Sequence, residues 1–291
     1  MQELRGTGVA LVTPFNEDLS IDYNGLTKLV EYCISGGVNY LVALGTTAES
    51  ATLSSEEKQA VVAHIIKVTN GRLPVVLGVG GNHTAAVVAE LKNGKYDGIS
   101  AILSVSPAYN KPTQEGIYQH FAAVATASSL PVVLYNVPGR TSSNMLPETT
   151  ARLARDFDNI IAIKEATGDM SQVLELIHKT PDDFMVISGD DTLSLSLVSA
   201  GGSGVISVIG QGIPEVFTEI INNGLDNAFA KAYKEHFKIL ELIDLIFEEG
   251  NPAGIKSLLA HQGVCKPFVR LPLVKATDEL HQKIGAFLNT L

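Results

Sequence analysis

The sequence predicts an α/β protein built as a (β/α)8 (TIM) barrel with a C-terminal helical extension. Short apolar runs recur eight times within roughly the first 210 residues, and stretches of helical length lie between them. Most runs are bounded by Gly, Pro or Asn, a pattern typical of parallel strands buried on both faces. The strand pattern stops after about residue 224. Eight strands that alternate with helices favour a closed barrel over an open doubly wound sheet.

Each apolar run is expected to form one strand. The runs cover residues 8–12, 40–44, 74–78, 99–103, 131–135, 160–163, 184–187 and 204–208. An open sheet that binds dinucleotides carries GxGxxG after its first strand, and no such motif follows residue 12. Among the helices, the one beginning near Ser54 has a clear start, because Ser54 and Glu57 have the spacing of a capping box.

Helical periodicity without strands is found at the end of the chain. It covers residues 225–249, 252–261 and 275–291. We therefore expect a catalytic barrel over residues 1–224 and a C-terminal helical region over residues 225–291. The helical region either packs on the barrel or mediates oligomerisation, and the sequence leaves both alternatives open.

Charge and composition exclude several classes of protein. The formal net charge of −10 argues against non-specific binding to nucleic acid or to an anionic membrane surface. Residues 1–6 lack the basic and apolar parts of a signal peptide, and no apolar run is long enough to span a bilayer. Cys33 and Cys265 lie outside any CxxC motif, so neither a disulfide nor a zinc site is expected. We expect a cytoplasmic protein.

Polar residues collect just after the apolar runs, where enzymes with this barrel place their chemistry. Lys164 ends the sixth run, Tyr135 ends the fifth, and Arg140 follows soon after. The other polar residues at such positions are Thr13, Thr46, Thr47, Asn82, Tyr109, Asn110, Asn136, Asp190, Asp191 and Ser207. They include no His, Cys or carboxylate cluster with metal-ligand spacing, so we expect neither a metal nor a cofactor.

Lys164 suits imine chemistry. An ammonium group is rarely fully buried, so a lysine that ends a buried strand either extends toward solvent or takes part in a reaction. A buried amine gives up its proton more easily than an exposed one and can attack a ketone. The resulting protonated imine withdraws electrons and acidifies the neighbouring carbon. Tyrosine and threonine hydroxyls can relay that proton, and an arginine can bind a substrate carboxylate.

Each of these residues alone also has a simpler interpretation. Lys164 could be salt-bridged, the tyrosines could be ordinary rim aromatics, and Arg140 could form a surface ion pair. Asp190 and Asp191 are predicted to cap the following helix rather than to act as acid and base. Only the combination of polar strand ends favours catalysis, and it does not identify a substrate.

Five segments resemble the dihydrodipicolinate synthase family of the pyruvate-dependent class I aldolase superfamily. They are residues 45–50 (GTTAES), 107–112 (PAYNKP), 134–141 (LYNVPGRT), 163–168 (IKEATG) and 204–207 (GVIS). The similarity runs from Gly6 to the C-terminus in matching order and spacing. It implies condensation of pyruvate with L-aspartate 4-semialdehyde to 4-hydroxy-tetrahydrodipicolinate, in the diaminopimelate route to lysine. It also implies a homotetramer built as a dimer of tight dimers.

The resemblance further implies how the protons move. Lys164 forms the Schiff base with pyruvate, and Tyr135 is the general acid and base beside it. Thr46 links Tyr135 to Tyr109 in a proton relay, and Tyr109 reaches in from a neighbouring subunit. All of these groups come from the chain, in keeping with the expected absence of a cofactor.

Substrate binding is assigned by the same resemblance. Thr47 holds the pyruvate carboxylate, the backbone of Ile206 contributes to that pocket, and Arg140 receives the carboxylate of the semialdehyde. Two positions depart from the family pattern. Ala48 replaces a common glycine, and Ala108 replaces an aromatic residue of the tight-dimer interface, which affects regulation more than chemistry.

Regulation by lysine is expected to be weak or absent. The family resemblance implies a regulatory site, because lysine-sensitive relatives bind L-lysine between the subunits of the tight dimer. They use a serine–alanine pair, an asparagine, histidines, a glutamate and a tyrosine. This chain keeps Ser50, Ala51 and Asn82. The remaining positions carry Ser55, Lys58, Ala86 and Ala108. A ligand ammonium therefore loses its carboxylate partner and meets the added positive charge of Lys58.

Two other functions remain open at this point. A lyase for sialic acid or a keto-deoxy sugar acid would share the lysine and tyrosine but not the carboxylate grip of residues 137–140. A catalytically inactive sugar-acid sensor would lose Lys164, Tyr135 or a relay hydroxyl, and all of these are present.

Overall fold

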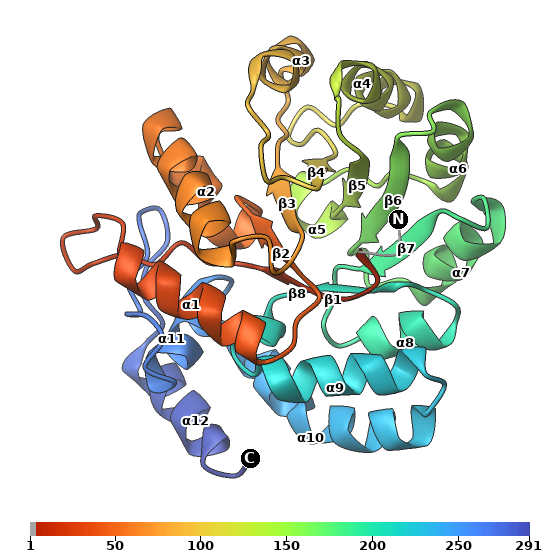
Figure 1. Ribbon diagram of the computed structural model, residues 1–291. Helices are drawn as coiled ribbons and strands as arrows, with labels where there is room; N and C mark the ends of the chain where they lie inside the picture. The colour runs from red at the N-terminus through yellow and green to blue at the C-terminus, as the bar shows by residue number, and fades with distance from the viewer. Residues whose placement is uncertain (1–3) are drawn as a thin grey trace.

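The computed structural model describes residues 4–291 and contains a closed barrel of eight parallel strands (Figure 1). Neighbouring strands pair in chain order, and β8 closes the barrel against β1. The strands are β1 (Gly6–Ala10), β2 (Tyr40–Ala43), β3 (Val75–Gly78), β4 (Ala101–Val105), β5 (Val132–Asn136), β6 (Ile160–Glu165), β7 (Met185–Ser188) and β8 (Gly204–Ser207). The predictions made for residues 1–3, at the start of the expected barrel region and in the segment expected to lack signal-peptide features, lie outside the described residues.

All eight predicted strands are confirmed, and the differences lie at their ends. β1 begins at Gly6 rather than at residue 8, because Gly6 pairs with Gly204 of β8. β6 continues past the apolar run through Lys164 and Glu165, because both residues pair with β5 and with β7. Lys164 is therefore part of the strand, and its backbone is held on both sides.

Helices surround the barrel (Figure 1). They are α1 (Tyr23–Ser35), α2 (Ser55–Thr69), α3 (Thr84–Asn93), α4 (Gln114–Ala127), α6 (Pro147–Asp156), α7 (Met170–Lys179), α8 (Ser194–Ser199) and α9 (Pro214–Leu225). Short helical turns are η2 (Thr46–Ala48), η3 (Ser50–Thr52), α5 (Pro138–Thr141) and η4 (Ile209–Gln211). The predicted capping box is confirmed, since Ser54 accepts from the Glu57 backbone while Glu57 accepts from the Ser54 backbone.

Three further helices follow the barrel, as the periodicity predicts. They are α10 (Phe229–Glu248), α11 (Ala253–His261) and α12 (Asp278–Leu288). Helix α10 packs on α9 and α8, while α11 and α12 pack on α10 and on each other. In Figure 1 these blue helices lie together on one side of the barrel. Within residues 4–291, none of the helices has both the length and the apolar character needed to cross a membrane.

Alternation along the strands builds two apolar layers, one inside the barrel and one between the barrel and its helices. The inner layer includes Tyr40, Val76, Leu103, Val133, Tyr135, Ala162, Ile187 and Ile206. The outer layer includes Leu41, Val75, Ile102, Leu134, Ile163 and Val186. A glycine at position 8 leaves room for the inner tyrosine, because a Cβ there would lie 2.2 Å from the ring of Tyr40. The interior is thus filled below the mouth at which the strands end.

Candidate functional site

Lys164 and Tyr135 lie side by side at the end of the barrel interior. They are register partners on β6 and β5, and the Lys164 Nζ lies 4.4 Å from the centroid of the Tyr135 ring. Lys164 is 5% exposed and Tyr135 is 7% exposed. Because Ala162 and Val133 face the interior, residues two positions later on the same strands face it too. The predicted convergence of this lysine and this tyrosine is present in the structure.

The amine of Lys164 is buried without a counter-charge. No ion pair or hydrogen bond within residues 4–291 involves its Nζ, which instead lies over the face of the Tyr135 ring in a cation–π arrangement. The aliphatic part of the side chain passes Gly189, where a Cβ would lie 2.9 Å from the Lys164 Cε. The salt-bridged alternative for Lys164 is therefore wrong within the described chain. Its nitrogen is free to bond to a substrate.

The two adjacent threonines of η2 take different positions. Thr46 is exposed and lines a cleft of about 730 Å³ that also reaches Tyr135, Val105 and Gly80. Thr47 is buried, and its Oγ1 accepts a hydrogen bond of 2.9 Å from the Asn251 side chain. Because the Thr47 oxygen already accepts, its own proton remains available to a substrate carboxylate.

Arg140 and Tyr109 both extend from loops at the mouth. Arg140 lies on α5, directly after β5, and its exposed guanidinium has no hydrogen bond or ion pair within residues 4–291. Tyr109 is 91% exposed, with a positive φ of 63°. Its loop is fixed by two hydrogen bonds of 2.7 Å between Asn82 and the Ala108 backbone. Tyr109 is therefore presented to solvent, and in the described chain it makes no hydrogen bond to Thr46.

Ile206 lies in the barrel wall on β8. Its side chain is 1% exposed and belongs to the inner apolar layer. Its backbone pairs with Gly8 of β1, whereas the ladder with β7 ends one residue earlier, at Val205. The main chain of Ile206 thus lies just beyond the last residue of β8 that pairs with β7.

A buried carboxylate directly behind Lys164 was not singled out by the sequence. Glu165 faces the helices, where it accepts hydrogen bonds of 3.0 Å from Asn136, 3.0 Å from Gln172 and 2.8 Å from the Thr167 backbone. Burial raises the pKa of Glu165, and these donors oppose the shift. Asn136 and Glu165 each follow a residue of the interior pair, so the network fixes both strand ends from outside.

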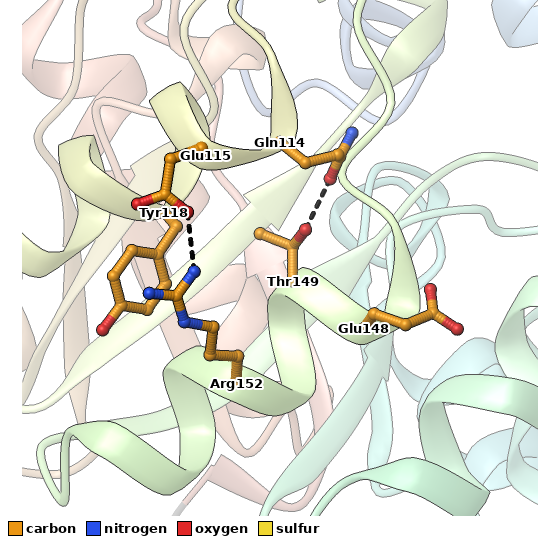
Figure 2. Close-up of a pocket in the computed structure, with 6 residues that line it drawn as sticks. All are labelled: Gln114, Glu115, Tyr118, Glu148, Thr149 and Arg152. Atoms are coloured by element: carbon orange, nitrogen blue, oxygen red, sulfur yellow. Dashed lines mark hydrogen bonds and ion pairs between the residues drawn. The ribbon is translucent and has the colours of Figure 1, made fainter.

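The same network continues to the outer helices. Asn144 receives a hydrogen bond from Asn136 and donates one to Gln172, and its carbonyl accepts from Gln114 at the start of α4. Figure 2 shows the small hollow beyond, where Gln114 also accepts from Thr149 of α6. Its other polar groups are also paired: Glu115 binds Arg152 at 2.7 Å, Glu148 binds Lys179, and Tyr118 donates to Asp156. We interpret this hollow as the outer edge of the hydrogen-bond network behind Lys164 and Tyr135, not as a substrate site.

Asp190 and Asp191 have separate roles. Asp190 accepts from the Leu193 backbone and fixes the turn that precedes α8. Asp191 instead is buried and accepts from the backbone N–H groups of Val208 and Ile209 after β8, at 3.1 and 2.8 Å. The capping prediction is thus wrong for both residues, because the N-cap position of α8 is Leu193, which has no side-chain cap. The N–H groups of Val208 and Ile209 lie close enough to bind the Asp191 carboxylate.

Asp191 should make stability depend on pH. Burial raises its pKa from 3.8 to about 6. The folded state then binds the proton more tightly, so this contribution to stability is complete below pH 3.8 and is lost as the pH rises through 6. Ionisation of Asp191 should lower the unfolding free energy by roughly 2–3 kcal/mol between pH 4 and pH 7. We expect the Asp191→Asn variant to lack this decrease. Denaturant unfolding at several pH values measures this slope, with Asp190→Asn as the control. An unchanged slope in Asp191→Asn would contradict the assignment.

Comparisons with known proteins agree with this geometry. The family model described as the dihydrodipicolinate synthetase family matches residues 3–291. A 4-hydroxy-tetrahydrodipicolinate synthase from Flavobacterium psychrophilum is 57% identical over 291 residues, covering 100% of this chain and 99% of the relative. The dihydrodipicolinate synthase from Acinetobacter baumannii, solved in complex with pyruvate, has a TM-score of 0.95 and 39% identity, covering 98% of both chains. The enzyme from Cyanidioschyzon merolae, solved with lysine bound, has a TM-score of 0.93 and 34% identity, covering 99% of this chain and 98% of that one. The chain therefore belongs to the dihydrodipicolinate synthetase family.

Proposed function

We propose that Lys164 carries the reaction of this family, in which the chain acts as a lyase that condenses pyruvate with L-aspartate 4-semialdehyde to 4-hydroxy-tetrahydrodipicolinate. One observation supports this role above the others. Lys164 is buried inside the barrel without an ion pair to any residue that the structure describes, and its amine lies over the ring of Tyr135. An amine that is not committed to a salt bridge can attack the ketone of pyruvate.

The bonds can be followed in order. The Lys164 amine adds to the pyruvate ketone and water leaves, which gives a protonated imine. Loss of a methyl proton gives the enamine, whose carbon attacks the aldehyde of the second substrate. The amino group of that substrate then displaces Lys164 from the imine and closes the ring. We assign the proton transfers to Tyr135, and the support for this role is that its ring lies beside the amine and that it shares a cleft with Thr46.

The carboxylates of the two substrates need separate partners. We assign the pyruvate carboxylate to Thr47, whose hydroxyl proton is available, together with the backbone of Ile206. Arg140 then receives the carboxylate of the semialdehyde, because its guanidinium is exposed at the mouth and unpaired in the described chain. The barrel over residues 1–224 would thus carry the chemistry, while residues 225–291 form the helical region. We propose a cytoplasmic location for the enzyme.

An assay with purified protein tests the function. We expect pyruvate to be consumed only when aspartate semialdehyde is present, and Lys164→Met to lower kcat by ~10³-fold or more because the covalent path is lost. Lys266→Met, at an exposed lysine, serves as the matched control. Cleavage of N-acetylneuraminate at a comparable rate would instead favour a sugar-acid lyase. Activity retained in Lys164→Met would contradict the role of this lysine.

We further propose a homotetramer built as a dimer of tight dimers, in which Tyr109 serves the neighbouring active site. The side chain is 91% exposed and lies on a loop at the mouth, which suits donation to another copy. Mixed inactive Tyr109→Phe and Lys164→Ala chains should regain activity, because each heterodimer contains one complete site. Native mass spectrometry verifies subunit exchange. Exchange without any recovered activity would rule out donation between subunits.

Weak inhibition by L-lysine is the remaining prediction. Lys58 and Ser50 line the cleft beside Thr46, and Ala86 supplies no carboxylate to a ligand ammonium. Loss of one charge-assisted contact weakens binding by roughly ten- to a hundredfold. Initial rates over a lysine titration should therefore show little effect below about millimolar concentrations. Introducing a glutamate by Ala86→Glu together with Lys58→His should increase the inhibition. Half-maximal inhibition of the unmodified enzyme at submillimolar lysine would contradict the prediction.

A further inference from the structure

The C-terminal helical region makes direct contacts with the turn that carries Thr46 and Thr47. A buried ion pair joins Glu49, which follows η2, to Lys256 on α11, with 2.5 Å between Nζ and Oε1. The side chains are 1% and 0% exposed, so both charges are shielded from water. Paired charges at such depth hold each other in place, because separating them would leave an uncompensated charge in the interior.

Every polar atom of this pair has a partner. The second carboxylate oxygen of Glu49 accepts from the Arg270 backbone at 2.8 Å. Lys256 also donates to the carbonyl of Phe268 at 2.8 Å, and its Nζ lies 4.2 Å from the centroid of the Phe15 ring. Phe15 belongs to the loop after β1, so the pair joins two barrel loops to the C-terminal region. The arrangement is rigid as well as buried.

Two more contacts from the same region reach the turn. Asn251 donates to the Thr47 hydroxyl at 2.9 Å, and the Arg270 guanidinium donates to the Thr52 carbonyl at 3.0 Å. Glu49 itself adopts a left-handed backbone conformation, with φ 54°, which a non-glycine residue holds only when its surroundings fix it. Residues 251–270 thus hold the segment from Thr47 to Thr52 at several points.

We infer that the C-terminal region is a positioning element of the active site, acting through the Glu49–Lys256 pair and Asn251 on the hydroxyl of Thr47. The inference rests on the proposed function, in which Thr47 binds the pyruvate carboxylate. Glu49 and Lys256 do not touch the substrate. They fix the turn, and Asn251 orients the Thr47 hydroxyl so that its proton faces outward.

The test measures the pyruvate concentration that gives half-maximal trapping by borohydride, a readout that does not involve the second substrate. The double variant Glu49→Gln/Lys256→Met removes both buried charges together, so neither is left unpaired. Asn251→Ala breaks only a neutral contact and tests the inference if the double variant fails to fold. We expect the half-saturating pyruvate concentration to rise roughly tenfold in the double variant and in Asn251→Ala, because the hydrogen bond from Thr47 to the charged carboxylate is misplaced. The exposed pair Glu235→Gln/Lys238→Met on α10 is the matched control and should leave it unchanged.

A double-mutant cycle separates positioning from general destabilisation. Thr47→Val should itself raise the half-saturating pyruvate concentration. If the C-terminal region acts through this hydroxyl, Asn251→Ala should add almost nothing in the Thr47→Val background. Additive effects, or an unchanged half-saturating concentration in Asn251→Ala, would overturn the inference. A parent protein that traps no pyruvate would instead contradict the proposed function, so the two failures are distinguishable.

Discussion

The register between β5 and β6 is the constraint on which the rest of the site depends. It makes Tyr135 and Lys164 direct neighbours and directs both side chains into the barrel. The same alternation sends Asn136 and Glu165 outward, where they bond to each other among buried groups. A shift of one residue would exchange the two pairs and place the reactive amine among the helices. The polar network behind the strands therefore protects the register as well as the strand ends.

Two buried lysines illustrate how environment decides the use of one residue type. Lys256 is fully buried, but Glu49 and the Phe268 carbonyl engage its ammonium. Lys164 is buried almost as deeply, but within residues 4–291 its ammonium has no ion pair and lies over the face of the Tyr135 ring. A paired ammonium holds structural elements together, whereas an unpaired one at the open end of a barrel can react. Burial alone would not distinguish them.

Much of the fold could be predicted from the sequence, because strand and helix patterns are local. Each apolar run forms a strand, and the parallel strands end at the same end of the barrel. Lys164 and Tyr135 could be placed together because consecutive strands of such a barrel are neighbours. The roles of the individual site residues stay predictions until they are tested with substrate.

The supporting contacts could not be predicted, because they join residues far apart in the chain. Lys256 and Glu49 are 207 positions apart, and nothing in the pattern around Lys256 marks it as a partner of the second loop. Asp191 resembles a helix cap in sequence, yet it binds the N–H groups after β8. Such choices are decided by which donors the folded barrel brings near, and a local pattern does not contain that information.

The identity of the reactive lysine is the central claim, and covalent trapping tests it most directly. The enzyme is incubated with isotopically labelled pyruvate and borohydride, digested, and mapped by mass spectrometry. We predict that the label lies on the peptide that contains Lys164, and that the peptide containing Lys256 is unlabelled. A label on Lys256, or undiminished labelling of Lys164→Ala, would contradict the account.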